Sequence, residues 1–72
     1  MGDVQRIQTL SNRVNRINIL LFLITRKKLQ LQKDIQTVSN EDLFCEIFQE
    51  LGEIDQTIWD LKIEKQRLIS LI

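Results

Sequence analysis

Apolar residues recur along this chain at alternating intervals of three and four positions, in two long runs. The first run comprises Ile7, Leu10, Val14, Ile17, Leu21, Ile24, Leu31, Ile35 and Val38, with Lys28 at one of its positions. The second comprises Phe44, Ile47, Leu51, Ile54, Ile58, Leu61, Leu68 and Ile72, with Lys65 at one of its positions. Such a rhythm, sustained over about four heptads, is typical of a coiled-coil helix. The pattern predicts two long helices, each with one apolar seam.

One polar segment separates the two runs. The chain has no proline, and its only glycines are Gly2 and Gly52, so nothing else interrupts the helical pattern. Ser39 or Asn40 is a suitable N-cap, and Ser39 with Asp42 comes close to a capping box. We expect a single domain over residues 1–72, with helix one at about 3–37, a turn at about 38–41 and helix two at about 41–71.

The two seams match when the chain folds back on itself at the polar segment. If paired residue numbers add up to 82, every seam residue from Leu10 onward meets a seam residue; Val14, for example, lies opposite Leu68. This register also predicts ion pairs between the helices: Arg13 with Glu64, Lys27 with Glu50, and Lys28 with Asp55 or Glu53. The predicted fold is all-α, an antiparallel two-helix coiled-coil hairpin.

The charges support this folding. Residues 1–38 carry seven basic and two acidic side chains, and residues 39–72 carry three basic and eight acidic ones. Oppositely charged halves favour packing against each other. A basic arm for nucleic acid is the alternative, because small helical hairpins that regulate plasmid copy number bind RNA through their helix faces. The basic residues for such a face are Arg6, Arg13, Arg16, Arg26, Lys27 and Lys33. The eight nearby acids weaken attraction to phosphate, so nucleic-acid binding is not the favoured reading.

Several further apolar or small residues lie off the seams, where a lone hairpin should be polar. We predict that these residues bind a protein partner: Ile19, Leu20, Phe22, Leu23, Phe48, Gly52, Trp59 and Ile63. Exposed apolar surface marks interfaces, and glycine inside a helix is often tolerated where another backbone approaches. The partner is either a second hairpin, completing a four-helix bundle, or a helix of a different protein.

The small size of the chain also favours association with a partner. In a chain shorter than roughly 70–80 residues, the hydrophobic core rarely supplies more than about 3–5 kcal/mol, so such a chain needs a further stabilising device. Cys45 is the only cysteine and histidine is absent, so we expect no intramolecular disulfide, no mixed Cys/His zinc site, and no other metal or cofactor. No catalytic group of residues or phosphate-binding loop stands out, and we predict a non-enzyme without a small-molecule substrate. Association with another chain is the stabilising device left.

One enzyme resemblance is visible. The stretch 14–18, Val-Asn-Arg-Ile-Asn, followed by Leu21 and Lys28, is similar to the first helix of the all-helical chorismate mutases. That helix carries aspartates where this chain has Asn15 and Asn18, and arginine where it has Lys28. A generic amphipathic rhythm explains the match better.

In length and organisation the chain also resembles the small co-chaperones of type III secretion needle subunits. The resemblance rests on a first helix with Leu10, Val14 and Ile17, a tight polar turn at Ser39 and Asn40, and a second helix ending in Leu68, Ile69, Leu71 and Ile72. In that family a short hairpin pairs with a larger helical-repeat chaperone to keep the needle protein soluble. The resemblance implies that residues 19–23, Trp59 and Ile63 face the partner.

The chain is expected to be cytoplasmic. No basic segment followed by an apolar stretch and a cleavage site marks a signal peptide. The longest apolar run, residues 19–24, is far shorter than the roughly 20 residues that span a bilayer. A lone thiol also suits a reducing compartment.

Overall fold

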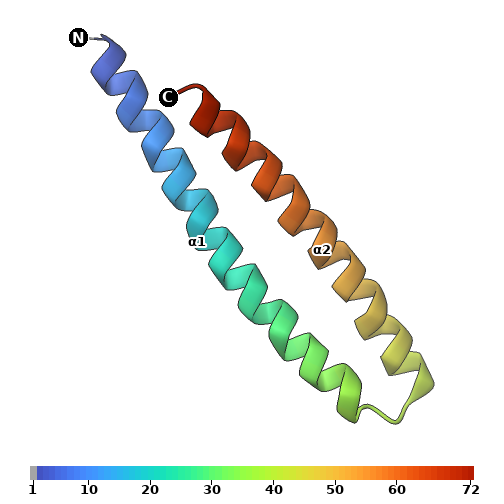
Figure 1. Cartoon of the computed structure of the whole chain (residues 1–72). Coiled ribbons are helices and arrows are strands. Elements are labelled where there is room, and N and C mark those ends of the chain that lie inside the picture. The colour runs from blue at the N-terminus through green and yellow to red at the C-terminus, as the bar shows by residue number, and fades with distance from the viewer. Residues whose placement is uncertain (1) are drawn as a thin grey trace.

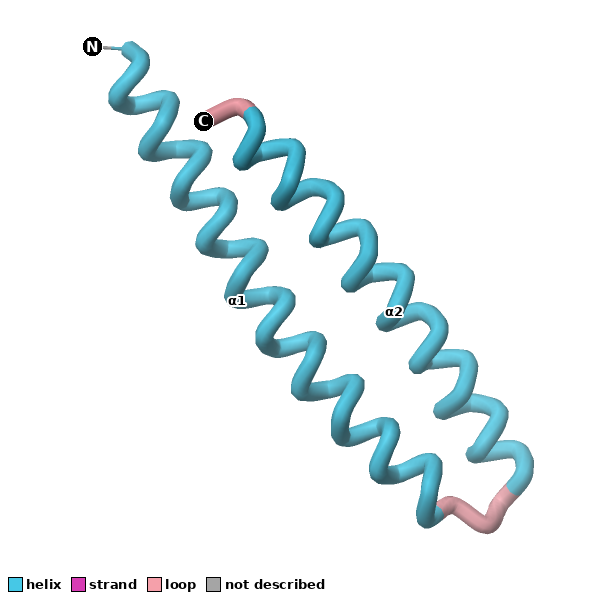
Figure 2. The backbone as a smooth tube through the Cα atoms, viewed as in Figure 1, coloured by secondary structure: helices cyan, strands magenta, loops and turns pink. Residues whose placement is uncertain are grey.

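The computed structural model describes residues 2–72, which form two long helices joined by a short loop (Figure 1). Helix α1 spans Gly2–Thr37 and α2 spans Glu41–Ser70, which confirms the predicted bounds to within one residue. The loop is residues 38–40. Figure 2 shows the helices running antiparallel, with both ends of the chain at the same end of the hairpin. The predicted all-α hairpin is therefore confirmed.

The hairpin is long and thin. It measures 60 × 15 × 12 Å with a radius of gyration of 16.9 Å, whereas a compact domain of this length would have about 11 Å. Its accessible surface is 5897 Å², against about 4,700 Å² for a compact monomer of the same mass. Much of the apolar surface therefore faces outward.

The core is a single line of contact along the two predicted seams. Within residues 2–72 the buried side chains are Leu10, Ile17, Ile47, Ile54 and Leu68, and all five are seam residues. Leu68, only 1% exposed, joins Leu10 and Ile17 in one cluster, against which Val14, Leu21 and Leu61 pack. This grouping agrees with the register that sets Val14 opposite Leu68 and Leu21 opposite Leu61.

Both ends of the seam are open. Ile7 and Ile72 are exposed at one end, and Phe44 is exposed at the other, although all three follow the seam pattern. In the predicted register Ile7 lies beyond the last residue of the chain that could face it. Beside the loop, the ring of Phe44 stacks on that of Phe48, with centroids 6.4 Å apart. The seam pattern thus overstates burial where only one helix, or the loop, is present.

The three predicted ion pairs between the helices all form. Their nitrogen–oxygen distances are 3.6 Å for Arg13–Glu64, 3.0 Å for Lys27–Glu50 and 2.6 Å for Lys28–Asp55, so the partner of Lys28 is Asp55 and not Glu53. Each is partly exposed and contributes no more than about 1 kcal/mol. These ion pairs help to fix the register of the two helices, because a shift of one helix along the other would separate all three pairs.

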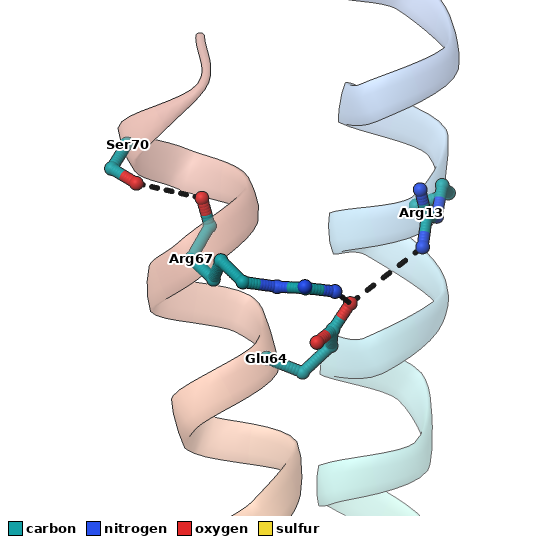
Figure 3. Close-up of polar contacts among 4 residues, drawn as sticks. All are labelled: Arg13, Glu64, Arg67 and Ser70. Carbon is teal, nitrogen blue, oxygen red and sulfur yellow. Dashed lines mark hydrogen bonds and ion pairs between the residues drawn. The ribbon is translucent and has the colours of Figure 1, made fainter.

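Glu64 also accepts a hydrogen bond from a residue of its own helix, α2. Its Oε1 accepts a hydrogen bond from Arg67 at 2.7 Å while it faces Arg13, and the Ser70 hydroxyl donates to the Arg67 carbonyl at 2.7 Å (Figure 3). The hydrogen bond to Glu64, helped by its negative charge, raises the pKa of the Arg67 guanidinium above its usual value. Arg67 therefore stays charged at any working pH.

Asn40 begins α2. Its side-chain oxygen accepts hydrogen bonds from the backbone N–H groups of Asp42 at 2.9 Å and Leu43 at 3.2 Å. Glu41 and Asp42 follow in the first turn, where the helix dipole favours negative charge. Of the two predicted caps Asn40 is the correct one, and the Ser39 capping box does not form because the helix starts one residue later than that box requires.

Replacing the cap should destabilise the hairpin. Asn40→Ala removes both side-chain hydrogen bonds at the start of α2 and should lower the free energy of unfolding by about 1 kcal/mol. Urea unfolding followed by circular dichroism measures this. Ser39→Ala is the matched control and should change little; equal losses from both variants would contradict the assignment of the cap.

Opening a cavity in the seam should cost more. Leu68→Ala empties the most buried position and should lower the free energy of unfolding by about 2–5 kcal/mol. Ile19→Ala, on the outer surface of α1, should change it by less than about 0.5 kcal/mol. If the two variants unfold alike at the same protein concentration, the seam is not the core.

Candidate functional site

The ion pairs distinguish the two long sides of the hairpin. Arg13 and Lys27 on α1, and Glu50 and Glu64 on α2, face each other on one side, which we call the charged flank. A helix returns nearly to the same direction every seven residues, so Leu20 and Thr57 lie between these pairs. The charged flank also holds a shallow groove of about 350 Å³, and its lining residues are Leu20, Leu23, Ile24, Lys27, Thr57 and Leu61.

The opposite side of the hairpin is almost free of charge. On α2 it consists of two rows with seven-residue spacing: Glu41, Phe48, Asp55, Lys62 and Ile69, and beside them Cys45, Gly52, Trp59 and Gln66. On α1 the corresponding rows are Val4, Ser11, Asn18, Thr25 and Gln32, and beside them Gln8, Asn15, Phe22, Leu29 and Gln36. We call these four rows the aromatic flank. Its charged members are Glu41, Asp55 and Lys62.

Aromatic side chains concentrate on this flank. Phe22, Phe48 and Trp59 belong to its rows and are 62%, 66% and 62% exposed, and the remaining aromatic residue, Phe44, stacks on Phe48. The guanidinium of Arg26, from the neighbouring outer surface of α1, lies 5.8 Å from the centre of the Phe22 ring. An aromatic, uncharged surface of this length is typical of an interface core, where charged residues are depleted.

The structure leaves all eight predicted partner-binding residues exposed, but they do not share one face. Phe22, Phe48, Gly52 and Trp59 lie on the aromatic flank. Leu20 and Leu23 lie on the charged flank. Ile19 and Ile63 lie between the flanks, on the outer surfaces of α1 and α2. Ile19, Leu20, Leu23 and Ile63, together with Phe22 and Trp59, form an apolar belt at one height of the hairpin.

The sequence-based prediction missed three apolar members of the aromatic flank. Val4 begins one row of α1, Leu29 follows Phe22 by seven residues, and Ile69 follows Lys62 by seven; all three are exposed. None of them falls in the dense apolar stretch 19–24, which drew attention to that one height. Tracing the rows beside each seam would have revealed all three residues.

Gly52 has no role inside the hairpin. A Cβ atom built there meets nothing within 4 Å, so neither packing nor close approach of α1 requires glycine. Glycine in a helix interior costs about 1 kcal/mol relative to alanine. A close approach by a second chain would explain why so unfavourable a residue stands beside Trp59.

The ion pairs also bear on the nucleic-acid alternative. Arg13, Lys27 and Lys28 each contact a carboxylate of α2. Their charge is therefore largely offset at the surface where a phosphate backbone would need it. This reduces the attraction of the α1 basic residues for RNA.

Filling the empty position should stabilise the isolated chain. Gly52→Ala should raise the free energy of unfolding by about 1 kcal/mol, because the helix gains propensity and the added methyl group meets open space. Thermal and urea unfolding at high dilution measure it. Gln49→Ala, on the outer surface of α2, is the control and should have a smaller effect. A loss of stability on Gly52→Ala would mean that the site is already occupied.

In comparisons with protein-family models, with curated proteins and with solved structures, nothing matches this chain. The resemblances to the needle co-chaperones and to the chorismate mutases therefore stay predictions. Within residues 2–72, neither helix is both long and apolar enough to cross a membrane. The function is inferred from the residues and their arrangement.

Proposed function

We propose that this chain is a non-enzymatic protein–protein interaction module, which associates through its aromatic flank with another helical surface. The observation that carries the proposal is the aromatic flank itself. It gathers Phe22, Phe48 and Trp59, more than half exposed, among mostly uncharged neighbours.

Burial on this flank would supply free energy for binding. Fully covering a large apolar side chain contributes about 1.5–3 kcal/mol. The flank offers six exposed apolar side chains, which are Val4, Phe22, Leu29, Phe48, Trp59 and Ile69. Association costs about 4–15 kcal/mol in lost freedom of motion, and covering these side chains together contributes favourable free energy against that cost. Binding would also stabilise the thin hairpin by mass action.

The charged flank is the weaker candidate. Its groove beside Leu20 and Leu23 lies between the Arg13–Glu64 and Lys27–Glu50 pairs. A partner that covered the groove would desolvate these pairs, and that cost can exceed their mutual attraction. The ion pairs are better suited to the solvated side of an assembly.

The needle co-chaperone role is one specific form of this proposal. In that form the aromatic flank would face a larger helical-repeat protein. We also propose a cytoplasmic location, because Cys45 is a free and exposed thiol, which suits a reducing compartment.

Charge introduced at the centre of the aromatic flank should abolish association. Trp59→Asp places a carboxylate where the largest apolar side chain would be covered, and should weaken binding by about 2 kcal/mol or more, or thirtyfold. Light scattering over a dilution series reports self-association. Capture from an extract of the native host, with the tagged chain as bait, reports a different partner.

Leu20→Asp is the matched control for this variant. Leu20 lies at nearly the same height and is similarly exposed, but belongs to the charged flank. Its replacement should leave association nearly unchanged. If Leu20→Asp weakens association more than Trp59→Asp does, the interface is on the charged flank. If the double variant associates like the original chain, both assignments fail.

A further inference from the structure

The α2 rows of the aromatic flank indicate what covers it. We propose that the occupant is a second copy of this chain. The two copies are related by a two-fold axis across the helices, so that α2 packs antiparallel against α2 and α1 against α1 in a four-helix bundle. The inference rests on the proposed function and adds the identity and register of the partner.

Charge complementarity along one row carries the inference. After Glu41 the row reads Phe48, Asp55, Lys62 and Ile69 at equal spacing. An antiparallel second copy presents the same row reversed, so Asp55 meets Lys62 of the second copy and Phe48 meets its Ile69. The Asp55 carboxylate, which pairs with Lys28 of its own chain at 2.6 Å, would then lie between two lysines. The contact then occurs twice, once on each side of the axis. A parallel copy would instead set each charge against itself, and like charges directly opposite are destabilising.

The neighbouring row fits the same register. The axis passes midway between Asp55 and Lys62, at the height of Trp59, so the two copies of this residue meet around it. In the hairpin register Phe22 of α1 lies at this height too, so the two copies of Trp59 and the two copies of Phe22 would share one height of the bundle. Gly52 then lies opposite Gln66 of the second copy, and the missing Cβ leaves room for that longer side chain.

Helix α1 sets no obstacle to this arrangement. Its two rows on the aromatic flank contain no charged residue between Val4 and Gln36. In the same symmetry Phe22 lies at the height of Thr25 of the second copy, and Leu29 at the height of its Asn18. All contacts between the α1 helices are therefore apolar or uncharged polar, and the charges of α2 determine the register.

The accessible surface area and the net charge of the chain are also compatible with a stable dimer. Two separate hairpins expose twice 5897 Å², whereas a compact protein of the combined mass exposes about 7,800 Å². The difference of at most about 4,000 Å² lies in the range of obligate homodimers, about 2,000–5,000 Å². The net charge of +0 at pH 7 means that two copies do not repel each other as whole molecules.

A charge exchange between two variants tests the register. Asp55→Lys places two lysines opposite two lysines across the axis, and Lys62→Asp places two aspartates opposite two aspartates. Each variant alone should raise the dimer dissociation constant by about tenfold. An equal mixture of the two should form a heterodimer that binds more tightly than either variant binds itself, because every like-charge contact across the axis becomes an opposite one. Asp55→Lys also removes the Lys28–Asp55 pair within its own chain, and mixing does not restore that pair.

Sedimentation equilibrium of each sample, with circular dichroism to record helix content, measures these outcomes. Lys33→Glu, on the outer surface of α1, is the control and should not alter the dissociation constant. Recovery in the mixture supports the proposal even if a single variant is partly unfolded alone. A dimer that is insensitive to both variants, or two variants that fail to recover when mixed, overturns the antiparallel pairing of α2.

The mass of the original chain separates this inference from the proposed function. A species near twice 8.6 kDa supports a second copy as the occupant. A monomer at every concentration overturns it. In that case capture of a host protein that Trp59→Asp abolishes, and Leu20→Asp does not, would leave the proposed function standing, and absence of such capture would overturn that as well.

Discussion

The structure depends on one line of contact between two helices. A pair of helices offers each partner a single seam, and within residues 2–72 only five side chains fall below the surface there. The apolar residues that lie off the seam stay exposed however well the seam packs. The geometry of a two-helix hairpin, more than any weakness of its sequence, leaves Phe22, Phe48 and Trp59 uncovered.

The ion pairs specify the register of the seam, which its apolar residues alone do not. Leucine and isoleucine layers are similar enough to tolerate a shift of one heptad. The pairs Arg13–Glu64, Lys27–Glu50 and Lys28–Asp55 are each weak, but all three hold only in one register. By occupying one flank, the first two also leave the other flank nearly without charge. Register and surface segregation therefore have a common electrostatic origin.

This segregation gives the hairpin two sides with different physical chemistry. Solvation by water stabilises the ion pairs of the charged flank, whereas the aromatic side chains of the other flank are stabilised when water is removed from them. A chain that is thin and of modest stability benefits most from covering the second, because association then adds the core that one seam cannot provide. Gly52 fits this view, since its backbone is open on the side that the proposed partner would approach.

Local spacing in the sequence was enough to establish the two helices, the seam, the register and the pairs Arg13–Glu64 and Lys27–Glu50, because heptad periodicity and charge depend on distances along the chain. It left the partner of Lys28 open between Asp55 and Glu53, and the structure selects Asp55. It also proposed both Ser39 and Asn40 as caps; only the backbone geometry of the turn decided for Asn40. Burial at the seam ends depended on whether a second helix was present, which left Ile7 and Phe44 exposed. The side on which each surplus apolar residue lies was decided by the tertiary structure. Residues beside the seam of one helix come to lie next to residues of the other helix only after the two helices pack antiparallel. This packing places Trp59 and Phe22 on the aromatic flank and Leu20 and Leu23 on the charged flank.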